Sequence, residues 1–180
     1  CAGCVLALGG EALAETPPLE EVPAHEDAGR LEAVLRNIVS VGCMSETVAV
    51  SIIRAEHAEL ADGPLAEVLA GILRDEIAHA RFGWGALGRL LPLLDGAAKA
   101  RLDAYLVDAL AHQVVYEIPK LSGIDRPREA LAQSGVCDGA SARSLFVETI
   151  ETVIVPGLET AGLSARDAWA SARLRTRHLL

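Results

Sequence analysis

Aromatic residues are scarce in this sequence: they make up 3% of its 180 residues, although hydrophobic residues make up 51%. The apolar side chains are therefore mainly those of Ala, Leu, Val and Ile, a composition that favours packed helices over a sandwich or barrel. Basic residues are also a minority, 16 against 25 acidic ones, and the net charge is −9. A protein that binds a phosphate backbone needs a basic surface, so we expect no nucleic-acid partner.

Long uncharged runs are missing too. The longest, Cys1 to Gly10, is much shorter than the roughly 18 residues that a membrane-spanning helix needs. We therefore expect a soluble, cytoplasmic protein without a membrane span. The hydrophobic content excludes a disordered chain, and the length favours one domain with a sizeable core.

Cysteine is sparse, and its four positions match neither a disulfide framework nor a zinc site. Cys1-x-x-Cys4 has the spacing of zinc ligands, but a second Cys or His pair to close the site is lacking. We interpret Cys43 and Cys4 as small buried hydrophobes. Because the sequence starts at Cys1 without a methionine, we expect a processed chain or a fragment of a longer one.

Helical periodicity, interrupted by Pro and Gly, divides the sequence into segments. We expect helices at 27–61, 64–91, 96–118 and 140–155, a loop at 122–139, and an amphipathic helical tail at 164–178. Pro119 and Pro156 are expected to end the third and fourth helices. No stretch shows strand alternation. The prediction is an all-α single domain, 1–180, in which 1–25 is the end of a preceding helix and a linker, 26–92 a helical hairpin and 95–180 further helices.

The informative motif is Glu76-Ile77-Ala78-His79, on the second long helix. Its carboxylate and imidazole are three residues apart, which places them on one helix face where both can hold the same metal ion. Alone, this tetrapeptide is more typical of a solvated Glu beside a surface His than of a metal site. Support comes from Glu46, whose same-face neighbours are small or apolar, because a carboxylate aimed into a core needs a partner or a metal.

The register of the expected hairpin brings these residues together. Glu46 lies about 16 residues before the turn at Asp62-Gly63, and His79 about 16 after it, so both lie roughly 24 Å from the turn. Two carboxylates and one imidazole are half of a di-iron carboxylate site. Oxygen and nitrogen ligands with open positions suit iron or manganese and leave room for dioxygen. Asp75 is a candidate acceptor for orienting the imidazole, and a solvated Asp is the alternative.

The segment Gly42-Cys43-Met44-Ser45-Glu46-Thr47, followed by Asp75-Glu76-Ile77-Ala78-His79-Ala80 and then Trp84, resembles the second half of ferritin-like domain-containing bacterial proteins of the di-iron type. The resemblance extends more loosely over nearly the whole chain. It implies an up-and-down, ferritin-like helical bundle in which Glu46, Glu76 and His79 are metal ligands and Trp84 is the downstream aromatic.

The family's first hairpin, with its own Glu and Glu-x-x-His, should precede Cys1, and the sequence does not contain it. Three completions remain open: a second copy across a two-fold axis, another chain, or a missing part of a longer protein. Candidate further ligands within this chain are His57, His112, Glu117, Glu148 and Glu151. His57 is about 16 Å from Glu46 along the helix, too far to share a metal with it.

The resemblance implies a di-iron-type oxidoreductase that activates dioxygen or peroxide and oxidises ferrous iron or a small organic substrate. It would bind two irons if the site is completed, or manganese, as a homo-oligomer or hetero-oligomer. The alternatives are a metal-free helical scaffold or assembly subunit, and an iron-storage protein. Gly83-Trp84-Gly85-Ala86-Leu87-Gly88 matches a dinucleotide fingerprint in letters, but no strand precedes it, and close helix packing explains its glycines better.

Overall fold

The computed structural model describes residues 2–7, 9–11, 22–122 and 136–180. All the regular secondary structure in these residues is helical, with no strand among them, which confirms the all-α prediction. The elements are α1 (Ala2–Ala7), α2 (Arg30–Asn37), η1 (Ile38–Ser45), α3 (Glu46–Ala58), α4 (Pro64–Leu90), η2 (Leu91–Leu93), α5 (Gly96–Ser122), α7 (Gly139–Thr149), η3 (Ile150–Ile154), α8 (Val155–Ala161) and α9 (Ala165–Thr176).

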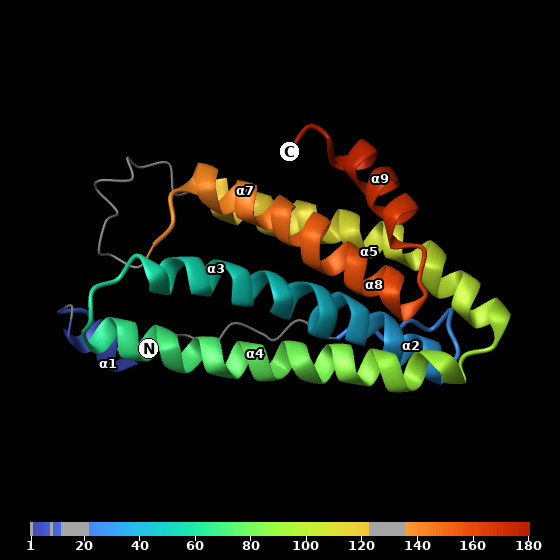
Figure 1. The fold of residues 1–180 in the computed structure, drawn as a ribbon, viewed down its shortest axis with the longest axis horizontal. Coiled ribbons are helices and arrows are strands. Elements are labelled where there is room, and N and C mark those ends of the chain that lie inside the picture. The colour runs from blue at the N-terminus through green and yellow to red at the C-terminus, as the bar shows by residue number, and fades with distance from the viewer. Residues whose placement is uncertain (1, 8, 12–21, 123–135) are drawn as a thin grey trace.

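The first long helix is continuous through α2, η1 and α3, as the periodicity predicts, and its middle part η1 is wound as a π-helix. It runs antiparallel to α4 and lies between α4 and a layer formed by α5, α7 and α8 (Figure 1). Pro64 is the first residue of α4, where its missing N–H costs no helical bond. The hairpin is therefore built as the sequence predicts.

By length and composition the helix Arg30–Ala58 is apolar enough to cross a membrane, a criterion that core helices of soluble proteins also meet. Only 28% of its most apolar 18-residue stretch is buried within the described part of the chain. The absence of a membrane span stays a prediction.

Two proline predictions were wrong. Helix α5 continues past Pro119 to Ser122, on a side of the helix where Val115 and Pro119 are exposed and water can bond the carbonyl that the proline leaves free. The chain also stays helical past Pro156, because the π-helical turn η3 widens the backbone just before the proline and relieves its clash with the preceding turn. This helix ends instead at Gly162, whose φ of +96° suits glycine.

The hydrophobic core lies between α5 and the helices that pack on it, which are α9, α7 and the first long helix. Fully buried side chains there are Leu35, Val39, Cys43, Met44, Leu102, Leu106, Leu110, Phe146, Ile150, Ile154 and Leu158. Cys43 is buried as predicted, whereas the side chain of Cys4 and most of the predicted loop 122–139 lie outside the described residues. The tail forms α9, and its Arg173 and Arg175 bond Glu151 and Asp108.

Candidate metal centre

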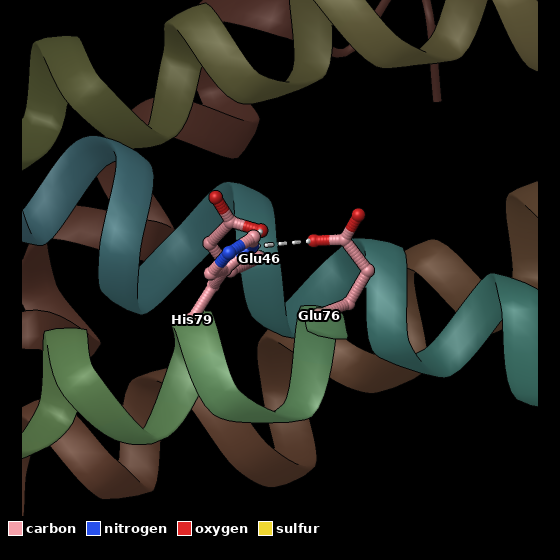
Figure 2. A group of neighbouring side chains, drawn as sticks. All are labelled: Glu46, Glu76 and His79. Atoms are coloured by element: carbon pink, nitrogen blue, oxygen red, sulfur yellow. Dashed lines mark hydrogen bonds and ion pairs between the residues drawn. The ribbon is translucent and has the colours of Figure 1, made fainter. Parts of the chain in front are cut away.

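The hairpin brings Glu46, Glu76 and His79 together. Glu46 is the first residue of α3, and the other two project from neighbouring turns of α4 toward it (Figure 2). One ligand atom from each residue lies within 4.8 Å of the other two, so the group can hold a metal ion. His79 Nδ1 is 3.3 Å from a Glu76 oxygen and 3.8 Å from a Glu46 oxygen. The predicted register is therefore correct.

Two glycines allow the helices to come close beside these ligands. A Cβ on Gly42 would lie 2.8 Å from the Cα of Gly83, and a Cβ on Gly83 would collide with the backbone of Gly42. Gly42 is one turn before Glu46, and Gly83 is one turn after His79. The close approach thus sets the distance across which the ligands face each other. Packing accounts for only this one glycine of the fingerprint-like run, since nothing lies near a Cβ built on Gly85 or Gly88.

A hydrogen bond also joins these two helices close to the contact between the glycines. Trp84 Nε1 donates to Thr47 Oγ1 at 3.0 Å. The indole also packs against Gly157 of α8, where a Cβ would lie 2.7 Å from the ring. Trp84 therefore connects the ligand-bearing hairpin to the layer behind it, a structural role that its position five residues after His79 does not reveal.

Polar side chains anchor the π-helical turn that leads into Glu46. Gln113 of α5 donates from Nε2 to the carbonyl oxygen of Ser40 (3.2 Å) and to Ser45 Oγ (2.9 Å). Ser40 Oγ bonds the hydroxyl of Tyr105 at 2.8 Å. These bonds satisfy groups that would otherwise be costly to bury, and they fix the backbone one residue before the ligand.

The carboxyl groups of Glu46 and Glu76 have pKa values that are shifted in opposite directions. Burial, together with the hydrogen bond and the negative charge of Glu76, raises the pKa of Glu46 to about 7, and His79 opposes this rise. The hydrogen bond from Glu46 lowers the pKa of Glu76, with burial acting in the opposite direction and His79 adding to the decrease. A cation bound here would displace the proton of Glu46, because a metal binds the ionised carboxylates.

The ligands open onto the surface through an apolar groove of about 530 Å³. Its lining includes Glu46, His79 and the apolar side chains of Val22, Val34, Ile38, Val41 and Phe82. The His79 side chain is 59% exposed, and Phe82 is 74% exposed. Small molecules can therefore reach Glu46 and His79 through this groove in a single copy of the chain.

The other candidate ligands do not join this group. Within the described ranges, Glu46, Glu76 and His79 form the one group of three or more that can hold a metal. His112 stacks on Tyr116, Glu117 pairs with Lys120, and Glu151 accepts bonds from Trp169 and Arg173. His57 lies in the last turn of α3, and Glu148 lines a separate surface pocket. Asp75 is exposed, and the neighbour of His79 Nδ1 is Glu76 instead.

Sequence reasoning found the three ligand candidates and missed the residues that position them. Nothing in the sequence marks Ser40 or Gln113 as a positioning residue. Ser45 and Thr47 stand in the segment 42–47, but the sequence gives no sign of the hydrogen bonds that they form. Comparison with known proteins gave no matching family model, no matching curated protein and no matching solved structure.

Proposed function

We propose that this chain is a ferritin-like, di-iron-type metalloprotein in which Glu46, Glu76 and His79 hold a redox metal. The observation that carries the proposal is the convergence of two carboxylates and one imidazole from two helices at one level. This is the ligand set that one half of a ferritin-like bundle supplies. The resemblance of the two helical segments to that family points the same way.

The donor set fits iron or manganese. Carboxylate oxygens with one imidazole nitrogen suit these metals, whereas zinc in structural sites prefers four closed ligands, often thiolates. The paired carboxyls also favour a cation, since burial and then the hydrogen bond and negative charge of Glu76 raise the pKa of Glu46 to about 7, and a cation would offset the cost of ionising both. When bound, iron would supply redox exchange with dioxygen or peroxide for oxidising a substrate.

Residues around the three candidate ligands would fix the positions of those ligands. Gly42 and Gly83 set the spacing of the ligands, and the bond from Trp84 to Thr47 fixes the helices that carry them. Apolar side chains line the groove beside Glu46 and His79, so a reactant in it would lie against apolar walls. The arrangement favours a small or apolar reactant that reaches the ligands along the groove.

A metal-free scaffold is the second candidate, because His79 and Glu76 already pair with each other at 3.3 Å. Metal binding distinguishes the two. Purified protein supplied anaerobically with Fe²⁺ should hold it, and Glu76→Ala or His79→Ala should weaken binding by more than the ~10 to 100-fold that loss of an outer partner of a ligand costs. Glu67→Ala, an exposed acid on the same helix, is the matched control and should change nothing.

Addition of air to the loaded protein then tests the redox part. We expect oxidation of the bound iron, followed optically, at a rate that depends on Glu46 and Glu76. Protein that holds no iron, or that holds it equally well after Glu76→Ala, would show that the group is structural. Formation of a shell of many subunits that accumulates iron far beyond two ions per site would indicate storage instead.

A further inference from the structure

A second pocket, with a volume of about 430 Å³, lies between the first long helix and α5. Small-molecule sites in proteins have volumes of ~300 to 1,000 Å³, so this pocket is large enough for an organic ligand. It has Asn37 and Val41 in common with the groove beside Glu46, but none of the three candidate metal ligands lines it. What this pocket can bind is therefore independent of the proposed metal.

Gln113 lines the pocket with a buried amide whose oxygen is unpaired. The residue is 4% exposed, and among the described residues its Oε1 has no hydrogen-bond partner. Its Nε2 donates to the carbonyl oxygen of Ser40 and to Ser45 Oγ. Rotating the amide by half a turn would place Oε1 against that carbonyl oxygen, which can only accept. The oxygen therefore needs a donor from elsewhere, because a buried acceptor without one is costly.

The hydroxyl of Tyr105 is a second polar group in the lining. It bonds Ser40 Oγ at 2.8 Å. A hydroxyl has one donor and two acceptor positions, so this one bond leaves it able to bond a ligand as well. Ser45 Oγ is already used, since it donates to the carbonyl oxygen of Ser40 and accepts from Gln113. The pocket thus offers a ligand one acceptor at Gln113 and one hydroxyl at Tyr105.

Two aromatic rings form another part of the lining. His112 and Tyr116, one turn apart on α5, stack with their centroids 5.7 Å apart and an interplanar angle of 19°. Both residues are exposed, and aromatic rings pair favourably with further rings, stacked or edge to face. Asp108 also lines the pocket, and its carboxylate already pairs with Arg175 at 2.7 Å. A carboxylate and an unpaired amide oxygen disfavour an anion, whereas a neutral ring with a donor suits all these groups.

We propose that this pocket binds a neutral aromatic molecule that carries a hydroxyl or N–H donor. The ring lies against His112 and Tyr116, and the donor bonds Oε1 of Gln113, with the Tyr105 hydroxyl as a further polar contact. The site is separate from the candidate metal centre, and its ligand binds whether or not a metal is present.

The experiment is isothermal titration calorimetry of the full chain with 2-naphthol. The matched probe is 2-methoxynaphthalene, which keeps the rings and the oxygen but has no donor. We expect 2-naphthol to bind ~3 to 10-fold more tightly, the factor that one hydrogen bond contributes. Tyr116→Ala, at a half-exposed position, should weaken both probes by ~3 to 10-fold through loss of the ring contact. Gln113→Leu should bring the two dissociation constants together.

Phe82→Ala is the matched control, because Phe82 is an exposed aromatic residue in the groove beside Glu46. It should leave the binding of both probes unchanged. Absence of 2-naphthol binding up to its solubility limit would overturn the proposal, and so would equal affinities for the two probes. Binding that falls in Phe82→Ala and not in Tyr116→Ala would place the probe in the other groove and overturn it too.

Gln113 also anchors the π-helical turn, so the folding of Gln113→Leu is checked first by circular dichroism. If that variant does not fold, the comparison of the two probes in the unsubstituted chain and the effect of Tyr116→Ala decide the question. The titrations are made without metal, so their outcome is independent of whether Glu46, Glu76 and His79 hold one.

Discussion

Helices α4 and α5 have the same length, 27 residues, and very different surroundings. In α4 only Gly83 and Leu87 are buried. The buried residues of α5 are Ala98, Leu102, Leu106, Ala109, Leu110, Gln113, Val114, Ile118 and Leu121. Helix α5 packs against α9, α7 and the first long helix, whereas α4 packs mainly against the first long helix and touches α8 through Trp84. Helix α5 therefore contributes most to the core, whereas α4 carries two of the three candidate ligands and is largely exposed among the described residues.

The same substitution on the two helices should give the largest contrast. Leu106→Ala on α5 removes a fully buried side chain and should lower the free energy of unfolding by ~2 to 5 kcal/mol. Leu65→Ala on α4 removes a side chain that is 43% exposed and should cost less than ~1 kcal/mol. Guanidinium unfolding at low micromolar protein measures both. Equal losses would mean that α4 is as well packed as α5.

Two glycines within α4 separate close packing from helix propensity. Gly83→Ala forces a methyl group against the backbone of Gly42 and should cost ~1 to 3 kcal/mol of stability. It should also weaken Mn²⁺ binding, because the helices that carry Glu46 and His79 must move apart. Gly85→Ala has open space around the new methyl and should stabilise the helix by ~0.5 to 1 kcal/mol. If the two variants unfold alike, the glycine contact is not what spaces the ligands.

Loss of the hydrogen bond that joins the two helices of the hairpin should have a smaller effect. Trp84→Phe keeps an aromatic ring but removes the donor to Thr47 Oγ1, and should cost ~1 kcal/mol. A double-mutant cycle with Thr47→Val isolates this contribution, since the coupling is lost when either partner is absent. A coupling energy near zero would show that the indole acts through packing on Gly157 alone.

The smallest expected effect is the dependence of the protein's stability on pH. Without metal, the pKa of Glu46 is raised from 4.5 to about 7, so between these values the folded state binds more protons than the unfolded one. Stability should therefore fall as pH rises through this window. The pKa of Glu76 is lowered, so its stabilising effect is lost only below about the unfolded value of 4.5, outside the same window.

Glu46→Gln should remove that slope between pH 5.5 and 7.5, as measured by thermal unfolding of the metal-free protein. Mn²⁺ binding should change in the opposite sense, tightening as pH rises, because the metal competes with the proton. A slope that persists in Glu46→Gln would assign the titration to another group.

The ligand group could be predicted because regular helix geometry alone determines where its three residues lie. The i, i+3 spacing sets Glu76 and His79 on one face, and equal distances from the turn bring Glu46 to their level. The ferritin-like family and the metal itself stay predictions. The continuation of the helices through Pro119 and Pro156 could not be predicted, because it depends on a π-helical turn and on solvent access that local propensity does not encode. The contacts of Gly83 and Trp84 could not be predicted either, because they join residues far apart in the sequence and form only when the helices pack.

Cys43 gives the hairpin a chemical reporter of its own. The thiol lies fully buried in η1, three residues before Glu46, and burial raises its pKa to about 12. The reactive thiolate is thus almost absent while the helices stay together. Alkylation of Cys43, followed by peptide mass spectrometry, will therefore record openings of the helix that carries Glu46. Comparison of its rate with and without added Mn²⁺ will show whether a metal slows this opening.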